Sequence, residues 1–382
     1  MRVVRRDRAG RWYLFLLGGV GFLTAFGAHA VVVNLPEYGR RYGLSYAALG
    51  LLLAAYNLAE IVVKPPAGRL ADRAGPRVVM LWGTVLFSLS CLAYLVLPPI
   101  TLAGLRVCQG LGAGALSVAS MVLVVRGYSR RLGGAFGIYN ALKGSGYVLA
   151  PLAGGFLGGG LRGALLFAGL AGTAVLCLLV ATGSPPAVRC GGKRPAPLPA
   201  RLWPWYLANF TDTALLGLVL GFLPVRADEL GYGAKEIGLL LTGLTLSYLA
   251  VQPAAGVLAD RVGRRPLVFG GLALASAATA VLGVFRGAGL ALAAVLAGLG
   301  LGVTWTNSLA AVGEAAGGEA AGDRLGLAGS CKDAGDIAGP MLFGLIAGRW
   351  GISAAFGLCG TLGLAVLGII ASGTGTGGQP AP

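Results

Sequence analysis

Ionisable side chains interrupt long apolar stretches of this sequence, at places where a membrane-embedded helix would carry them. A charged residue at the centre of such a helix costs about 2.5–3.5 kcal/mol to insert, so it is retained where it faces a cavity or a partner. A carboxylate in a partly dry environment can exchange a proton near neutral pH, and a buried cation can attract an anion. The candidates for a substrate and proton pathway are therefore His29, Glu60, Lys143, Asp212, Lys332, Asp333 and Asp336.

Some members of this set have partners that the sequence itself suggests. Lys332 and Asp336 are four residues apart, so they share one helix face and can neutralise each other. Asp333 lies about 100° further round the same helix and needs a different partner, such as a residue of the second or fourth span. His29 can titrate near physiological pH, but for a single histidine a hydrogen-bonded packing role is favoured.

These residues require a scaffold that spans a bilayer. Of the 382 residues, 56% are apolar and only 12% are charged, whereas about a quarter of the residues in a soluble domain are charged. Stretches of about 20 apolar residues are long enough to cross the hydrocarbon core as helices. The sequence predicts twelve such spans, at 12–34, 46–67, 78–97, 101–125, 133–157, 163–183, 203–224, 236–255, 267–285, 289–312, 326–347 and 352–372.

The formal net charge of +16 has a simple explanation in a membrane protein. Lys and Arg accumulate in cytoplasmic loops, so a basic chain of this kind needs no nucleic acid partner. Counted over alternate loops, 19 basic residues lie on one side and 7 on the other. This bias predicts a multi-pass protein of the plasma or inner membrane, with both termini in the cytoplasm.

The chain is built from two similar halves. PPAGRLADRAGPR at 65–77 recurs as PAAGVLADRVGRR at 253–265, an offset of 188 residues, and further matches follow in order along the chain. Residues 184–202 are rich in Pro and Gly, which is typical of a linker. We therefore expect a six-helix bundle over 1–183, a cytoplasmic linker over 184–202 and a second six-helix bundle over 203–382.

The repeat predicts how the halves are related. Six spans separate the copies, and six is even, so both copies have one orientation and an axis along the membrane normal relates them. Such a duplication is typical of a transporter that works by alternating access. Lys143 and Lys332 occupy equivalent positions, 189 residues apart, and a pair of lysines on matching sides of a central path would attract an anion.

The repeated segment is the most specific motif in the chain. GRLADRAGPR and GVLADRVGRR resemble the signature loop of the major facilitator superfamily, which implies a role in gating the cytoplasmic side. Gly68 and Gly256 allow close helix approach, and Gly75 and Gly263 suit a tight turn. Asp72 and Asp260 can pair with a basic residue or with a helix N-terminus. The residues that the resemblance assigns to gating are Gly68, Asp72, Arg73, Gly75, Arg77, Gly256, Asp260, Arg261, Gly263 and Arg264; Pro76 stands where a basic residue is expected.

Two further segments resemble motifs of the same superfamily. LRVCQGLGAG at 105–114 resembles its fourth-span pattern, which makes Arg106 a candidate for proton relay or substrate charge compensation, although an arginine there could also snorkel to the membrane surface. Glycines along the fifth span resemble the antiporter-type motif of drug-efflux members, and the eleventh span repeats much of it; close helix packing is the alternative reading. The residues of this bundle-interface motif are Gly137, Gly146, Pro151, Gly154, Gly155, Gly335, Gly339 and Pro340.

Together these features predict an all-α, twelve-span protein of the major facilitator type, most similar to drug-efflux proton antiporters. We expect a secondary active transporter of a small molecule, coupled to protons, embedded in the lipid bilayer and functional as a monomer. No phosphate-binding loop, nucleophile elbow or metal-ligand cluster is present in the sequence, so we expect no enzymatic activity, no metal and no cofactor. The alternatives are a proton-coupled importer of a small organic anion and a sensor that no longer transports.

Overall fold

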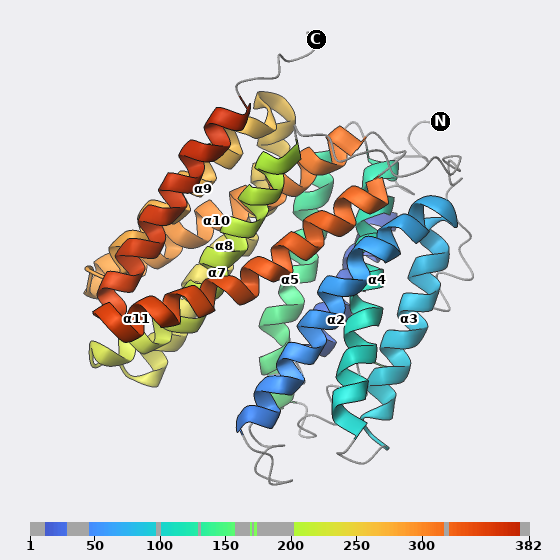
Figure 1. The fold of residues 1–382 in the computed structure, drawn as a ribbon, viewed down its shortest axis with the longest axis horizontal. Coiled ribbons are helices and arrows are strands. Elements are labelled where there is room, and N and C mark those ends of the chain that lie inside the picture. The colour runs from blue at the N-terminus through green and yellow to red at the C-terminus, as the bar shows by residue number, and fades with distance from the viewer. Residues whose placement is uncertain are drawn as a thin grey trace. The chain divides into compact units, whose positions relative to one another are not determined.

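The structure is a computed structural model of the whole chain, and it describes residues 12–28, 46–96, 101–128, 131–156, 169, 172–173, 202–316 and 321–374. Within those residues every regular element is a helix (Figure 1). His29, most of the predicted span 163–183 and the predicted linker, apart from Leu202, lie outside the described residues.

The helices of the first half follow the predicted spans closely. A first apolar helix runs over Trp12–Ala28. The helices after it are α2 (Tyr46–Arg73), α3 (Pro76–Ala93), α4 (Leu102–Gly127) and α5 (Leu132–Phe156). Contacts join α2 to α3 and α4, and α3 to α4, so these three helices lie side by side (Figure 1).

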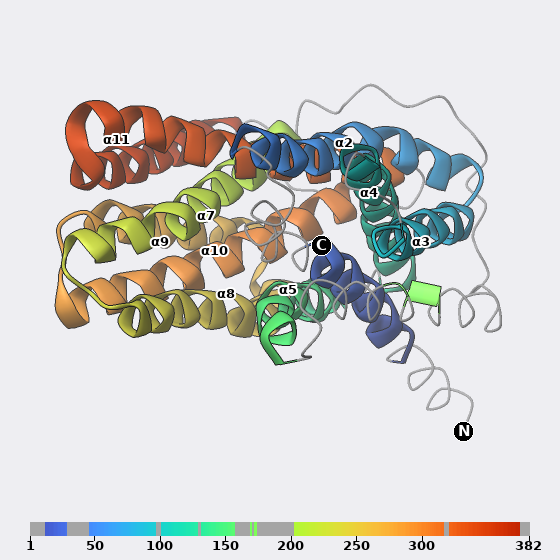
Figure 2. The same ribbon diagram turned by 90° about the horizontal axis from the view of Figure 1, so that it is seen from below.

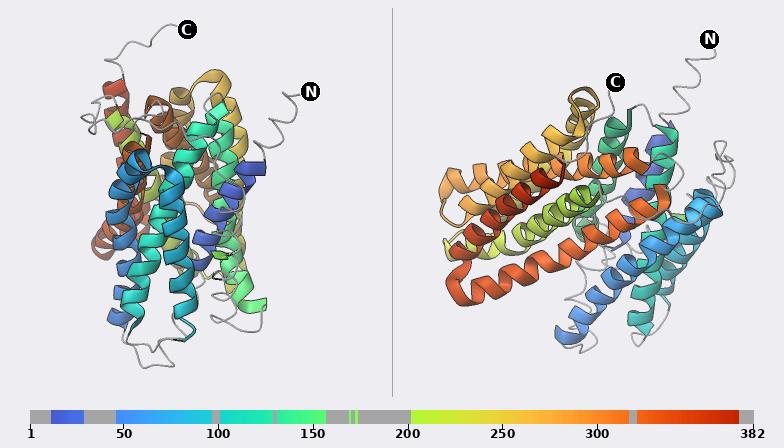
Figure 3. Two further views of the ribbon diagram at one scale, coloured as in Figure 1. Left: turned by 90° about the vertical axis from the view of Figure 1, so that its right-hand side faces the viewer. Right: turned by 45° about the horizontal axis from the view of Figure 1, so that its top comes forward.

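The second half repeats the pattern with longer helices. They are α7 (Trp203–Glu229), α8 (Ala234–Val262), α9 (Arg264–Leu282), α10 (Gly287–Ala316) and α11 (Ala321–Thr374). α11 contains the last two predicted spans, because the chain leaves helical geometry at Gly351, where φ is 83°, and then continues as a helix. The α11 ribbon doubles back on itself at this break (Figure 3). α7, α8 and α9 contact one another (Figure 2).

Several helices extend beyond the spans that hydropathy predicts. α2 continues to Arg73 and α8 to Val262, so the signature motif lies mostly on the last turns of these helices and not in a loop. Hydropathy marks where a helix leaves the hydrocarbon, whereas the helix itself ends where the backbone must turn. The turns are made by Gly75 and Gly263, with φ of 97° and 93°, a conformation that is costly for residues with a side chain. The predicted need for glycine at these two turns is confirmed.

The chain divides into two compact units that do not coincide with a cut at the linker. Unit 1 contains residues 1–129, 138–195 and 316–330, and unit 2 contains 130–137, 196–315 and 331–382. The first residues of α5 therefore belong to unit 2, and the first residues of α11 belong to unit 1. Each unit thus includes one helix start from the other half of the sequence.

The internal repeat recurs as matching close contacts inside each unit. In unit 1 a Cβ atom on Gly110 would lie 2.4 Å from the carbonyl oxygen of Tyr56, and in unit 2 a Cβ on Gly298 would lie 2.3 Å from that of Leu244. Both residues of the second pair are 188 positions after those of the first. Helices approach this closely only where a side chain is missing. The sequence repeat therefore corresponds to a repeat of helix packing.

Side chains in unit 2 pack as a conventional apolar core. Phe343 is fully buried, and its ring centroid lies 4.4 Å from that of Phe222 and 4.7 Å from that of Phe356. Many other Leu, Val and Phe side chains point outward, as expected of helices that face lipid. Seven of the described helices are long and apolar enough to span a membrane, with α11 counted once.

Candidate functional site

The Asp72 cluster, defined as Gly68, Arg69, Asp72, Arg126, Gly322 and Asp323, lies within unit 1 at the C-terminal end of α2. Both carboxylate oxygens of Asp72 accept hydrogen bonds of 3.0 Å from backbone amides at the start of α11, those of Gly322 and Asp323. Arg126 Nη2 donates to the same carboxylate at 3.0 Å. An acid at a helix N-terminus is stabilised by the unpaired amides and by the helix dipole.

Two other features complete this cluster. Arg69 Nε lies 2.8 Å from Asp323 Oδ1 in an exposed ion pair. A Cβ on Gly68 would lie 2.0 Å from the carbonyl oxygen of Gly322, so α2 and α11 touch backbone to backbone. Burial raises the pKa of Asp72 above its ordinary value, although the amides of Gly322 and Asp323 and the Arg126 guanidinium act to lower it.

The Asp260 cluster, defined as Gly133, Gly134, Gly256, Asp260, Arg264 and Glu314, lies within unit 2 at the C-terminal end of α8. Asp260 accepts hydrogen bonds of 3.0 Å from the amides of Gly133 and Gly134 at the start of α5. A Cβ on Gly256 would lie 2.0 Å from the carbonyl oxygen of Gly133. The predicted pairing of Asp72 and Asp260 with a helix N-terminus is confirmed in both copies.

The basic partners of the two aspartates come from different positions. Arg264, at the start of α9, forms ion pairs with Asp260 and with Glu314 at the end of α10. Pro76 occupies the position in the first copy that corresponds to Arg264, and Arg126 occupies the position that corresponds to Glu314. The missing arginine of the first copy is thus replaced by an arginine from α4.

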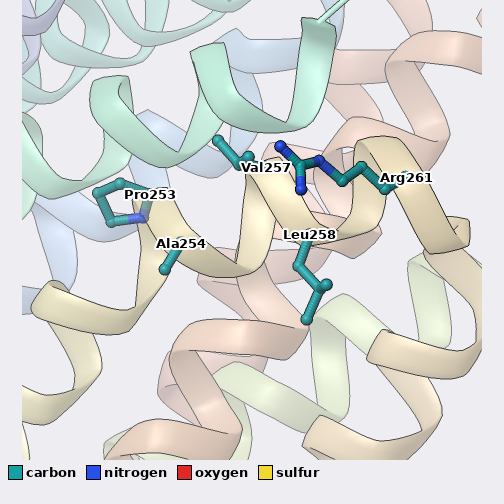
Figure 4. A pocket seen from close by; sticks show the side chains of 5 residues that line it. All are labelled: Pro253, Ala254, Val257, Leu258 and Arg261. Carbon is teal, nitrogen blue, oxygen red and sulfur yellow. The ribbon is translucent and has the colours of Figure 1, made fainter.

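Three further residues that the resemblance assigns to gating, Arg73, Arg77 and Arg261, are not among the residues that define the two clusters. Arg73 and Arg261 are exposed, and Arg77 is partly buried at the start of α3. Arg261 lines a shallow depression of about 440 Å³ on α8, together with Pro253, Ala254, Val257 and Leu258 (Figure 4).

Unit 1 contains a cluster of polar side chains that lie between its helices. Lys64 is buried and its Nζ lies 2.8 Å from Glu60 Oε1, one turn earlier in α2. Lys143 Nζ in α5 donates to Ser117 Oγ in α4 at 3.0 Å. The fully buried hydroxyl of Tyr139 lies beside Ser117. Glu60 and Lys143 therefore lie in one polar region, but Glu60 pairs with Lys64, which the sequence analysis did not single out.

Arg106 is held by several partners within unit 1. Its side chain is buried, and it donates to Gln109 Oε1 at 2.8 Å and, over longer distances of 3.4 and 3.5 Å, to the carbonyl oxygens of Leu52 and Ala28. Its guanidinium carbon lies 4.6 Å from the centroid of the Tyr56 ring. The snorkelling alternative is wrong, because the buried guanidinium bonds inward to neighbouring helices.

Unit 2 contains an acidic group of residues. Lys332 forms an ion pair with Asp336, as predicted, and its Nζ also lies 3.4 Å from Asp333 Oδ1. The expectation that Asp333 would not pair with Lys332 is therefore wrong, since the long lysine side chain reaches both carboxylates. Asp212 in α7 is fully buried within electrostatic reach of Lys332 and Asp336. Neither oxygen of Asp212 has a hydrogen-bond partner among the described residues.

The glycines of the bundle-interface motif make close helix contacts. A Cβ on Gly146 would lie 2.5 Å from the carbonyl oxygen of Phe22, and one on Gly335 would lie 2.4 Å from that of Phe210. A Cβ on Gly137 would lie 2.4 Å from the carbonyl oxygen of Gln252, and one on Gly339 would lie 2.0 Å from that of Ala214. Pro151, Gly154 and Gly155 lie in the last turns of α5, and Pro340 lies within α11. These contacts support the alternative reading of the motif, in which its glycines allow close packing of helices.

Sequence reasoning missed the residues that supply partners for the two motif aspartates. Gly133, Gly134, Gly322 and Asp323 supply the amides, and Arg126 and Glu314 supply charges. One available signal was the repeat itself, because Gly133 and Gly322 are aligned at the offset of 189 residues that relates α5 to α11.

Comparison with known proteins agrees with this architecture. The family model of the Major Facilitator Superfamily matches residues 17–205 and 202–374. The quinolone resistance protein NorA of Staphylococcus aureus strain MSSA476 is 30% identical over 234 residues, which is 58% of this chain and 60% of NorA. The multidrug resistance protein Stp of Mycobacterium tuberculosis is 35% identical over 144 residues, which is 36% of this chain and 27% of Stp. The matched region thus spans about 60% of NorA and a smaller part of Stp.

Solved structures share the fold over nearly the whole chain. The human organic anion transporter MFSD10 has a TM-score of 0.78 at 16% identity, covering 94% of this chain and 99% of its own. The Escherichia coli fucose:proton symporter FucP has a TM-score of 0.78 at 15% identity, covering 95% of this chain and 98% of its own. With two matches to the family model and this fold, the chain belongs to the Major Facilitator Superfamily and is a multi-pass membrane protein.

Proposed function

We propose that this protein is a secondary active transporter that exports a small molecule in exchange for protons by alternating access. The observation that carries the proposal is the acidic group of unit 2. Asp212 is fully buried with no hydrogen-bond partner for either oxygen among the described residues, and Asp333 and Asp336 share one lysine. A buried carboxylate of this kind is stable when it is neutral, so it can bind and release a proton as its surroundings change.

The similar proteins support export as the direction of transport. NorA and Stp are named as resistance proteins, and the glycine motif of α5 resembles that of drug-efflux members. The proposed moving parts are the two halves of the sequence, 1–183 and 203–382, joined by the linker 184–202. The Asp72 and Asp260 clusters would then gate the cytoplasmic side. We also propose that the transporter is a monomer in the plasma membrane with both termini in the cytoplasm, in line with its loop charges.

Import of a small organic anion is the second candidate. It is supported by Lys143, which has a hydroxyl and no carboxylate as its described partner, and by the similarity of the fold to a structure named as an organic anion transporter. Purified protein in liposomes with an imposed pH gradient separates the candidates. Extrusion of a cationic or zwitterionic dye supports export, and accumulation of a carboxylate driven by external protons supports import. Absence of gradient-driven flux for every solute tested would contradict both and favour a sensor.

The proton site is tested with single substitutions in the same liposomes. Asp212→Asn should abolish accumulation driven by the pH gradient, while exchange of solute for solute should continue, because exchange needs no net proton movement. Asp333→Asn, Asp336→Asn and Glu60→Gln are the matched comparisons. If all four variants keep full coupling, the proposal that a carboxylate of this set carries the proton is wrong, and His29 becomes the remaining candidate.

A further inference from the structure

We propose that Lys143 is the binding residue for an anionic group, most simply a carboxylate, on the transported solute, whereas its repeat counterpart Lys332 serves only unit 2 itself. This inference rests on the proposed function, since it concerns the solute of that transporter. It adds the chemical class of the solute and assigns different roles to two residues that the repeat makes equivalent.

The position of Lys143 in its helix prevents its charge from reaching the membrane surface. α5 runs from Leu132 to Phe156, and Lys143 is eleven residues from its start and thirteen from its end. At 1.5 Å per residue these separations are roughly 16 and 20 Å. A lysine side chain spans about 6 Å when extended, so it cannot snorkel over such a distance.

The side chain is also fixed inside unit 1. A Cβ atom on Gly21 of the first helix would lie 3.0 Å from Cβ of Lys143 and 3.3 Å from its Cγ, so the stem of the lysine packs against that helix. The ammonium group then reaches Ser117 Oγ in α4 at 3.0 Å. Lys143 as a residue is partly exposed and not buried.

The hydrogen bonds of this ammonium group are incomplete. An ammonium group has three donors, and in the part of the chain that the structure describes it makes one hydrogen bond, to a neutral hydroxyl, and no ion pair. The nearby Glu60 is already paired with Lys64 at 2.8 Å. A cation at this depth is costly unless an anion or water compensates it. A solute carboxylate can accept hydrogen bonds from the donors of the ammonium that Ser117 does not use.

Lys332 has the same place in the repeat but a different environment. Its ammonium forms ion pairs with Asp336 and Asp333, and its backbone oxygen accepts a 2.8 Å hydrogen bond from Thr213 Oγ1 in α7. The residues of unit 1 that correspond to Asp333 and Asp336 are Gly144 and Tyr147. The carboxylates that neutralise Lys332 therefore have no equivalents beside Lys143.

Equilibrium binding of a matched pair of probes to the purified wild-type protein tests the proposal. The probes are naphthoate and naphthamide, which share a ring system and differ in charge. Binding is measured in detergent at neutral pH without a gradient, so it does not depend on proton coupling or on the direction of transport. Wild-type protein should bind naphthoate at least tenfold more tightly than naphthamide.

The variants then test whether Lys143 is the residue that recognises the negative charge of naphthoate. Lys143→Met should weaken naphthoate binding about tenfold or more and leave naphthamide binding unchanged, and Lys143→Arg should retain most of the preference. The control Lys235→Met, which removes an exposed lysine at the start of α8, should change naphthoate affinity less than twofold. Lys332→Met should likewise keep the preference for naphthoate. Ser117→Ala provides a second variant that keeps the charge, and it should cause a smaller loss than Lys143→Met.

Three results would overturn the inference: equal affinity of the wild-type protein for both probes, no saturable naphthoate binding, or unchanged naphthoate affinity in a folded Lys143→Met variant. If Lys143→Met does not fold, an unchanged preference in Ser117→Ala together with a lost preference in Lys332→Met overturns it equally. Failure of gradient-driven transport with this binding pattern intact would instead count against the proposed function.

Discussion

The Asp72 and Asp260 clusters share a backbone arrangement and differ in their charges. In each cluster, an aspartate at the end of one helix accepts hydrogen bonds from two backbone amides at the start of another helix. Beside it, two glycines bring the two backbones into direct contact. In the first copy the arginine is Arg126 of α4, and in the second it is Arg264 of α9, which also holds Glu314. The backbone contact is therefore the constant requirement, whereas the position of the arginine can move between helices.

The largest expected effect comes from adding a side chain at the shared backbone contact. Gly68→Ala and Gly256→Ala each place a Cβ 2.0 Å from a carbonyl oxygen, and backbone cannot move aside as a side chain can. Each should cost more than about 3 kcal/mol of stability. Thermal unfolding of the purified protein measures this loss. Gly270→Ala is the matched control, because a Cβ there has nothing within 4 Å, and it should be neutral or slightly stabilising. Equal unfolding temperatures for all three variants would contradict the shared requirement.

Removing the arginine should affect the two clusters unequally. Arg264→Met leaves two carboxylates, Asp260 and Glu314, without their shared cation and should cost about 3 kcal/mol. Arg126→Met leaves Asp72 with both backbone amides and should cost about 1.5 kcal/mol. Unfolding temperatures give the order.

A charge exchange tests whether the arginine beside Asp72 can be supplied from either of two helices. Arg126→Glu should destabilise more than Arg126→Met, because it places a second acid beside Asp72. Adding Pro76→Arg should recover part of that loss, since it gives the first copy the arrangement of the second. A double-mutant cycle measures the coupling, and zero coupling would show that the two positions do not substitute for each other.

Neutralising the aspartates tests whether the clusters act in gating. Asp72→Asn keeps an oxygen for one amide but loses the charge, so it should lower the transport rate about tenfold, the equivalent of 1.4 kcal/mol, with little change in expression or solute affinity. Initial rates in liposomes provide the measurement. Normal transport by Asp72→Asn, together with slow transport by Asp260→Asn, would assign gating to the second copy alone.

The smallest effect is expected at the ion pair that only the first copy contains. Arg69 pairs with Asp323, whereas the equivalent positions in the second copy hold Val257 and Gly134, which carry no charge. The Arg69 side chain is 54% exposed, so Arg69→Ala should change stability by no more than about 0.5 kcal/mol. The remaining difference should vanish at high salt. A loss above about 1 kcal/mol that persists at high salt would show that this pair is a necessary part of the first cluster.

Patterns of spacing predicted the parts of the site that are local in sequence. The turns at Gly75 and Gly263 and the pairing of Lys332 with Asp336 depend on neighbouring residues, and all are confirmed. The repeat predicted that Asp72 and Asp260 would behave alike, because it compares two copies of one arrangement.

Partners that lie far apart in sequence could not be predicted individually. Hydropathy ends the predicted span at residue 125, which leaves Arg126 in a loop, whereas α4 continues to Gly127 and brings the Arg126 side chain to Asp72. The amide donors belong to glycines, whose type carries no sign of a hydrogen bond to a distant acid. The charge on Lys143 and the lack of acidic counterparts to Asp333 and Asp336 follow from the repeat, but the contact of Lys143 Nζ with Ser117 Oγ depends on packing.

The two clusters also differ in the order in which the ribosome makes their parts. Asp260 finds its amide donors 127 and 126 residues earlier in the chain, so they already exist when Asp260 is synthesised. Asp72 must wait for donors 250 and 251 residues later, which is roughly 12–50 s at ordinary rates of translation. During that interval the glycine face of α2 and the Asp72 carboxylate have no amide partner from α11. A nascent chain that stops before Gly322 can form the amide contacts of the second cluster but not those of the first.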